Sequence, residues 1–275
     1  GREIGNLLVE HPDIEKVSFT GGTSTGRHLA HIAAEKLMPI SLELGGKSPT
    51  IMFDDCDQDL AIAGILFGIF SSTGQSCIAG SRLFIQRSIY DEFLNRLVEA
   101  TKALKVGNPF DTNTQVAPMV HFEHRESVES YVQIARDEGG EIITGGSRPE
   151  GKEFDQGAFY QPTIITGLDN RSQTCREEIF GPVLSIIPFE DEAEAVQIAN
   201  DTPYGLASGI WSENITRCMR MIHTIKSGVV WVNTYRVAAP QAPFGGMKDS
   251  GFGRVRGEAG ILEFTQTKNV FIDFQ

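Results

Sequence analysis

Cysteine is scarce in this chain, and long apolar runs are missing. Only four cysteines occur among 275 residues, none in a Cys-x-x-Cys pair and none with histidines at zinc-finger spacing. We therefore expect no disulfide scaffold and no metal site, and a reducing, cytoplasmic compartment is the expected location. The longest apolar run, Leu60 to Phe70, is too short to cross a membrane, so no membrane partner is expected.

Positive charge is also in short supply. Lysine and arginine number 24 against 36 acidic residues, which gives a net charge of −12. Such a chain repels phosphate backbones, so nucleic-acid binding is not expected. With 40% hydrophobic and 22% charged residues, the composition is typical of a globular protein with a real core. The first residues, Gly1 to Gly5, include no Met and have the pattern of a helix interior, so we expect a fragment rather than a signal peptide.

Helical and extended patterns alternate along the chain. This alternation predicts an α/β protein with a largely parallel, open twisted sheet. An apolar stripe from Leu29 to Leu37 predicts one helix, and residues 57–70 form a helix apolar enough to be buried. The remaining helices are expected at residues 90–104, 123–138, 193–200 and 215–225. Strands are expected at residues 17–20, 40–44, 82–86, 141–144, 183–188, 207–211 and 228–233.

A glycine-rich loop at residues 19–27 joins an expected strand to an expected helix. The N-terminus of a helix offers free N–H groups and the positive end of a dipole to an anion such as a phosphate. The loop is not a Walker A sequence, because Arg27 and His28 stand where Lys and Ser/Thr are required. Its residues alone fit either a phosphate-binding turn or a plain strand-to-helix connection.

Glu43 stands between Leu42 and Leu44 at the end of an expected strand, followed by Gly45 and Gly46. A carboxyl group among apolar neighbours is desolvated, which raises its pKa and suits a general base. The alternative is a glutamate at a strand edge that faces solvent.

Cys77 lies in a loop framed by Gly74 and Gly80, directly after the apolar helix. The thiolate is the nucleophilic form of cysteine, and exposed backbone N–H groups in such a loop are expected to lower the thiol pKa and to hold an oxyanion. The alternative is that a lone cysteine behaves as a small buried hydrophobe. That alternative is our prediction for the three cysteines without such a frame, Cys56, Cys175 and Cys218.

Two further motifs follow in the second half of the chain. Residues 177–183 read Glu-Glu-Ile-Phe-Gly-Pro-Val, and residues 243–254 read Pro-Phe-Gly-Gly-Met-Lys-Asp-Ser-Gly-Phe-Gly-Arg. Taken in order with the three motifs above, they resemble the NAD(P)-dependent aldehyde dehydrogenase superfamily, specifically its C-terminal, catalytic portion. Five motifs in the family's order make a chance match implausible.

The resemblance implies a reaction and two catalytic residues. In the family, the cysteine that corresponds to Cys77 attacks the aldehyde carbon to give a thiohemiacetal, which passes hydride to NAD or NADP and leaves a thioester. The carboxylate that corresponds to Glu43 activates the water that hydrolyses this thioester, so the product is a carboxylic acid. A CoA-acylating relative is the alternative enzyme, although retention of Glu43 favours hydrolysis. A non-catalytic module that folds but binds no dinucleotide is the alternative outside enzymes.

The resemblance also implies contacts with the cofactor and the aldehyde. The pyrophosphate would lie along the glycine loop, and the nicotinamide end would contact residues further along the chain. Phe244 would line the substrate funnel, with a plain core position as the alternative. Residues 237–240 occupy the family's substrate loop, and their small side chains suggest a roomy entrance without naming the aldehyde. The residues predicted to contact the cofactor are Gly21, Gly22, Gly26, Leu44, Glu178 and Phe180.

The resemblance divides the chain into three parts. Residues 1–43 would be the remnant of a dinucleotide-binding domain, residues 44–250 the catalytic domain, and residues 251–275 a C-terminal closing and oligomerisation segment. The family's Trp-Asn motif, which holds the second oxyanion donor, and the residues that grip the adenosine ribose are not found in this sequence. We therefore expect this chain alone to bind NAD(P) weakly and to be inactive, while the parent enzyme would be a homodimer or homotetramer.

Overall fold

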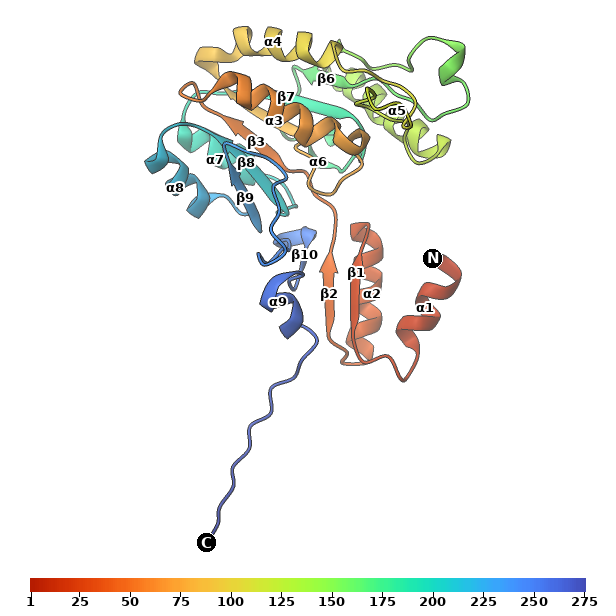
Figure 1. Cartoon of the computed structure of the whole chain (residues 1–275), viewed down its shortest axis with the longest axis vertical. Helices are drawn as coiled ribbons and strands as arrows, with labels where there is room; N and C mark the ends of the chain where they lie inside the picture. The colour runs from red at the N-terminus through yellow and green to blue at the C-terminus, as the bar shows by residue number, and fades with distance from the viewer.

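Two separate β-sheets organise the chain, one above the other in Figure 1. The computed structural model describes residues 1–275, apart from the side chain of Arg2. The smaller sheet has the strand order β1-β2-β10, and the larger one has the order β5-β6-β7-β4-β3-β8-β9. The two sheets divide between them the elements that carry the predicted motifs.

The smaller sheet is built mainly from the first 43 residues. Strands β1 (Val17–Thr20) and β2 (Ile40–Glu43) pair in parallel, and β10 (Gly251–Phe252) returns from the far end of the sequence to pair antiparallel with β2. Helices α1 (Arg2–Glu10) and α2 (Thr23–Glu35) belong to this part of the chain. Its core is a small cluster of buried apolar side chains, Val9, Leu29, Ala33 and Met38.

The larger sheet confirms the predicted fold class. Every neighbouring pair of its strands is parallel except β5 and β6. Its strands are β3 (Pro49–Met52), β4 (Arg82–Gln86), β5 (Glu141–Thr144), β6 (Thr163–Thr166), β7 (Val183–Phe189), β8 (Ala207–Trp211) and β9 (Val229–Val232). Its helices are α3 (Gln58–Phe70), α4 (Tyr90–Lys102), α5 (Phe122–Asp137), α6 (Gln173–Arg176), α7 (Glu192–Asn200) and α8 (Ile215–Thr224).

Helices cover both faces of the larger sheet, as its parallel strands require. Successive side chains of a strand point to opposite faces. Met52 and Leu83 pack in one apolar cluster with residues of α3 and α4. Their neighbours Ile51 and Phe84 pack in another cluster with residues of α7 and α8. The sheet is therefore a rigid layer, and loops at its edges can position reactive side chains.

Several expectations from the sequence pattern were wrong. Helix α2 ends at Glu35, and Leu37, expected on its apolar stripe, lies beyond it with φ +52° and 92% exposed. Helix α3 is not buried all round, because Leu60 and Phe67 are more than half exposed. The sequence pattern also missed the central strand β3, which begins at Pro49 and is too short for alternation to reveal it.

The chain passes between the two sheets through residues 44–48, which are buried. Hydrogen bonds of Ser250 stabilise this connecting segment. Its hydroxyl donates to the Gly45 carbonyl at 2.7 Å and accepts from the Gly205 amide at 2.9 Å. The Ser250 carbonyl accepts a further bond from the Leu44 amide at 3.0 Å. Ser250, which directly precedes β10, therefore fixes the position of the backbone that connects the two sheets.

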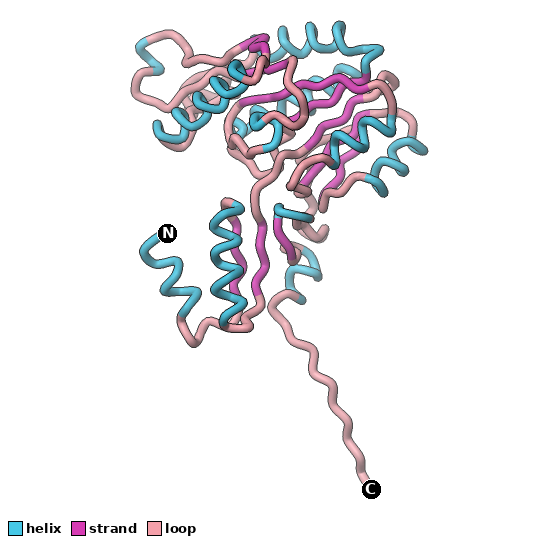
Figure 2. Tube along the Cα trace, turned by 180° about the vertical axis from the view of Figure 1, so that it is seen from behind, coloured by secondary structure: helices cyan, strands magenta, loops and turns pink.

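The C-terminal segment extends away from both sheets beyond α9 (Gly257–Leu262), as Figures 1 and 2 show. Its apolar side chains are largely exposed: Phe264, Val270, Phe271, Ile272 and Phe274. Among the described residues, no helix is both long and apolar enough to cross a bilayer.

Candidate active site

Glu43 ends strand β2 with a buried carboxyl group. The residue is 6% exposed, and its Oε2 atom has no hydrogen-bond partner among the described residues. Burial raises the pKa of Glu43 from 4.5 to about 7, although the charges of Arg254 and Arg256 act in the opposite direction. The alternative of a solvent-facing glutamate is therefore wrong. A carboxyl group that titrates near neutrality can accept and release protons under working conditions.

Cys77 lies in the loop between α3 and β4. A turn precedes it in which Ser72, Thr73 and Gly74 all have positive φ. Gly74 is required there, because its φ is +71° and a Cβ atom would overlap the carbonyl of Gly181. The turn thereby brings the cysteine loop against the backbone of the Glu-Ile-Phe-Gly-Pro motif.

The pKa of the Cys77 thiol is raised, mainly by burial and then by the carboxylates of Glu178 and Glu43. The expectation of a lowered pKa was wrong, because the hydrogen bonds from the backbone N–H groups of Cys77 and Ile78 are outweighed by this burial. The thiol is therefore protonated at neutral pH and needs a base before it can attack. Cys77 is nevertheless the accessible thiol of the chain, since the other three are buried as predicted: Cys56, Cys175 and Cys218.

Cys77 and Glu43 line the same cleft, which has a volume of about 450 Å³. Phe244 also lines it, which fits the predicted funnel position rather than the core alternative. The loop residues 237–239 and the buried Trp231 of β9 complete this wall. The structure thus brings the two predicted catalytic residues and the predicted substrate residue together, although they come from both sheets and from distant parts of the sequence.

Glu178 lies against the turn that follows Glu43. Its Oε1 accepts a hydrogen bond from the Gly46 amide at 3.0 Å, and a Cβ atom at Gly45 would overlap its carboxylate. Burial raises the pKa of Glu178, while the Gly46 hydrogen bond and the charge of Lys47 lower it. Glu178 is therefore a half-buried carboxylate at the crossing between the sheets, and it does not line the cleft with Cys77.

The glycine loop forms the start of helix α2, with Gly22 at the N-cap position and no side chain capping the helix. Gly21 and Gly22 are exposed, so the first N–H groups of the helix can receive an anion. Gly26 differs, because it is buried, its N–H donates to the Gly22 carbonyl at 3.0 Å, and a Cβ atom there would overlap Leu44. The structure therefore gives Gly26 and Leu44 a helix-to-strand packing contact, and their contact with a cofactor stays a prediction.

Phe180 is 39% exposed and has a positive φ of +57°. The Nε2 atom of His124 lies 2.7 Å from the Phe180 carbonyl oxygen, and the two rings stack edge to face with centroids 6.2 Å apart. A non-glycine residue with positive φ is strained unless its surroundings hold it in place. The strain presents the Phe180 ring at the surface, where a planar ligand could pack against it.

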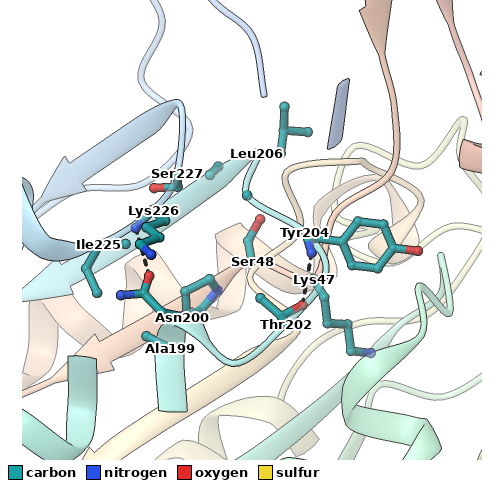
Figure 3. A pocket seen from close by; sticks show the side chains of 13 residues that line it. Lys47, Ser48, Ala199, Asn200, Thr202, Tyr204, Leu206, Ile225, Lys226 and Ser227 are labelled. Carbon is teal, nitrogen blue, oxygen red and sulfur yellow. Dashed lines mark hydrogen bonds between the residues drawn. The ribbon is translucent and has the colours of Figure 1, made fainter. Parts of the chain in front are cut away.

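Lys47 was missed by the sequence analysis. Its side chain is fully buried, and its Nζ atom has no hydrogen-bond partner among the described residues. Burial lowers the pKa of Lys47 to about 8. Figure 3 shows Lys47 with Thr202 and Tyr204 around a small cavity of about 10 Å³. This cavity has room for about one water molecule, so it is not a substrate site.

Two arginines at the cleft were also missed. Arg236 directly precedes the predicted substrate loop, and Arg256 follows the Gly-Phe-Gly-Arg motif; both line the cleft that contains Cys77. Both have positive φ, +61° and +66°. The sequence signal for a role of Arg236 at the cleft is its position directly before the predicted substrate loop. The small side chains of that loop indicated only a wide entrance and gave no indication of charge.

Comparison with known proteins agrees with this geometry. The sequence-family model described as "Aldehyde dehydrogenase family" matches residues 1–270. Similar curated proteins include the (Z)-2-((N-methylformamido)methylene)-5-hydroxybutyrolactone dehydrogenase of Acinetobacter baylyi, 47% identical over 99% of the chain. The betaine aldehyde dehydrogenase of Sinorhizobium fredii is 44% identical over 98% of the chain.

A solved structure is equally similar. The betaine aldehyde dehydrogenase of Staphylococcus aureus, crystallised as a point mutant in complex with NAD+, superposes with a TM-score of 0.94 at 44% identity. The match covers 96% of this chain and 54% of the other. The chain covers 55% of each of the two curated relatives, so it spans about half the length of the proteins it resembles.

Proposed function

The chain belongs to the aldehyde dehydrogenase family, and we propose that it carries the reactive residues for the NAD(P)-dependent oxidation of an aldehyde to a carboxylic acid. One observation carries this proposal. A protonated thiol at Cys77 and a carboxyl group at Glu43 that titrates near neutrality line a single cleft. A nucleophile with an adjacent base is the arrangement that covalent catalysis on a carbonyl compound requires.

The first step uses Glu43 as the base for the thiol. Ionised Glu43 takes the proton from Cys77, and the thiolate forms a bond to the aldehyde carbon while the carbonyl oxygen becomes an oxyanion. We expect the backbone N–H of Cys77 to donate to that oxyanion. The result is a thiohemiacetal on Cys77, with the carbon still carrying its hydrogen.

The residues present also fit a dinucleotide. The uncapped start of α2 with exposed Gly21 and Gly22 can hold a phosphate, and the Glu178 carboxylate and the Phe180 ring are suited to ribose hydroxyls and a flat ring, respectively. Gly26 and Leu44 support this site by packing α2 against the residue that follows β2. The chemistry that NAD or NADP supplies when bound is acceptance of a hydride.

Release of the product uses Glu43 a second time. With a thioester on Cys77, Glu43 takes a proton from water, the oxygen of that water bonds to the acyl carbon, and the sulfur leaves as a thiolate. The buried position and the pKa of about 7 make Glu43 an effective base for this hydrolysis. These properties favour hydrolysis over transfer of the acyl group to CoA, which needs no such base.

The names of the relatives point to two different substrates, a hydroxybutyrolactone and betaine aldehyde. We propose small aldehydes as the substrates of this chain, and a homodimer or homotetramer as the assembly of the enzyme. The exposed apolar side chains of residues 264–274 support the assembly proposal, because such side chains are normally covered by a partner surface.

The test follows cofactor reduction. Because this chain spans only about half the length of its relatives, a panel of aldehydes is offered to the whole protein with NAD or NADP. The absorbance of the reduced nicotinamide is recorded for the wild type, Cys77→Ser and Cys56→Ala. We expect Cys77→Ser to abolish turnover and Cys56→Ala, a buried cysteine outside the cleft, to retain it. A parallel assay with a p-nitrophenyl ester reports acylation of Cys77 without any cofactor. Full turnover by Cys77→Ser in both assays would contradict the proposal.

A further inference from the structure

We propose that the cleft beside Cys77 selects aldehydes that carry a carboxylate, and that the guanidinium of Arg236 recognises that carboxylate. The inference rests on the proposed function, since it names the substrate class of the same site. The favoured substrates would be oxo acids, in which one end of the molecule is oxidised at Cys77 while the other end is bound as an anion.

Hydrogen bonds hold Arg236 beside the nucleophile. Its Nη2 atom donates to Ser76 Oγ at 2.8 Å, and Ser76 is the residue directly before Cys77. Its Nη1 atom donates to the carbonyl oxygen of Ser71 at 3.4 Å and to the Ser71 hydroxyl. The guanidinium is therefore fixed at the wall of the cleft, on the side that carries the thiol.

None of these partners carries a negative charge. Among the described residues, no carboxylate lies within ion-pair distance of Arg236, whereas other arginines of the chain have one, such as Arg217 with Asp55 at 3.0 Å. A guanidinium has five N–H donors, and the three bonds to Ser71 and Ser76 leave two of them unused. A half-buried cation without an anion is costly, and a bound carboxylate would supply the missing partner through charge-assisted hydrogen bonds.

A second cation adds to the same field. Arg256 lines the cleft as well, with its guanidinium 5.2 Å from the centroid of the Phe244 ring. The one carboxyl group in the wall is Glu43, which is largely neutral below pH 7 because burial raises its pKa. The cleft is thus positive in a chain whose net charge is −12. Such a local reversal of sign favours an anionic ligand over a cationic one.

The aromatic side chains at the cleft argue against a cationic aldehyde. A quaternary ammonium group is normally bound by the faces of aromatic rings. Here a protein cation already covers one of them, since Arg256 lies over Phe244, and the other aromatic side chain in the wall, Trp231, is buried. A trimethylammonium aldehyde would therefore meet two positive charges in place of an aromatic cage.

The first test measures charge selection without cofactor or turnover. Iodoacetate and iodoacetamide alkylate the same thiol and differ in one negative charge, so the ratio of their rates at Cys77 reports the field of the cleft. Any change in the thiolate fraction affects both reagents equally and cancels in the ratio. A small free thiol supplies the reference ratio, and labelling is read by peptide mass spectrometry.

We expect the wild-type chain to favour iodoacetate relative to the reference thiol, and Arg236→Gln to lower the ratio by about tenfold, as loss of one charge-assisted hydrogen bond implies. Arg236→Lys should retain most of the preference, because it keeps the charge. Arg148→Gln is the matched control, because Arg148 pairs with Glu129 on an exposed surface outside the cleft. An unchanged ratio in Arg236→Gln, with Arg256→Gln also unchanged, would overturn the proposal.

The second test compares an oxo acid with its methyl ester, which has the same aldehyde without the charge. We expect the wild-type enzyme to have the higher kcat/KM for the acid, and Arg236→Gln to lose about tenfold or more on the acid, mainly in KM, while the ester changes little. A preference for the ester or for a trimethylammonium aldehyde would overturn the substrate class and leave the proposed oxidation intact. Failure of the whole protein to oxidise any aldehyde would instead contradict the proposed function, even with a normal alkylation ratio.

Discussion

The amide of Gly46 donates a hydrogen bond to the carboxylate of Glu178 across 132 positions of sequence, at 3.0 Å. This bond joins the turn after the proposed base to the motif that we expect to hold the nicotinamide ribose. The two glycines of the turn face different neighbours. A Cβ atom at Gly45 would overlap the Glu178 carboxylate, and one at Gly46 would overlap the backbone carbonyl of Cys77.

Alanine at these two glycines should therefore have different effects. In Gly45→Ala the flexible Glu178 side chain can swing aside, so we expect near-normal stability but a KM for the cofactor raised by about tenfold, the effect of losing one such hydrogen bond. In Gly46→Ala the obstacle is backbone, so we expect a loss of about 1–3 kcal/mol in unfolding free energy. Denaturant unfolding and cofactor titration separate the two. Gly5→Ala, with open space around it, is the control.

Cys77 should be the thiol that is alkylated first. Its rate is expected to rise with pH well beyond neutrality, because its pKa is raised and only the thiolate reacts. The other three cysteines should react only on unfolding, since they are buried. Peptide mapping after limiting iodoacetamide at several pH values gives both results. Earlier labelling of Cys175 or Cys218 would contradict the assignment.

Glu43→Gln should stop hydrolysis more than acylation. The amide keeps the size of the side chain but cannot take a proton from water, so a burst of product followed by a slow steady state is expected. In the wild type, the hydrolysis rate should rise as the pH passes through about 7, where Glu43 loses its proton. In the variant this rise should vanish. A steady-state rate equal to that of the wild type would exclude Glu43 as the base.

Lys47→Met should change the way stability depends on pH. The pKa of Lys47 is about 8 in the folded chain against 10.5 when exposed, so between these values the unfolded chain binds one more proton and the wild type gains stability as pH rises. At about 1.4 kcal/mol per pH unit, the gain approaches roughly 3 kcal/mol. The variant should lack it. Urea unfolding at pH 7 and pH 10 measures the difference, and parallel curves for both proteins would refute the prediction.

The alternation of helical and extended patterns predicted the fold class, and the motifs singled out Glu43 and Cys77, which line one cleft, because each of these signals depends on local sequence. Glycines at residues 46 and 74 mark places where a Cβ atom would overlap backbone, and the family's order of motifs ties them together. The pKa of Cys77 could not be predicted this way. Its value depends on burial and on Glu178, which lies 101 positions away along the chain. The local sequence indicated the backbone N–H groups that lower the pKa of Cys77. It gave no indication of the burial and the carboxylate that raise this pKa.

The cationic character of the cleft was hidden for the same reason. Arg236 and Arg256 lie in separate loops, 20 positions apart, and nothing in the sequence shows that their side chains meet at one site. Their common property, a guanidinium that faces the cleft without a carboxylate partner, exists only after the loops fold around Cys77. The strand β3 was missed on different grounds, since four buried residues with no alternation resemble a loop or a helix end equally well.

Glu43 belongs to the smaller sheet and Cys77 to a loop of the larger one, and the buried Ser250 hydroxyl holds the crossing between them. The positions of Glu43 and Cys77 therefore depend on each other, and substitutions that shift one sheet also change the distance between these two residues. A substitution that moves one sheet by a fraction of an ångström would have to be matched in the other, or at Ser250, before the base and the nucleophile could meet again. Recombination that exchanges one sheet between distant homologues should accordingly yield folded but slow enzymes, and compensating changes should appear first around residues 44–48 and 249–251.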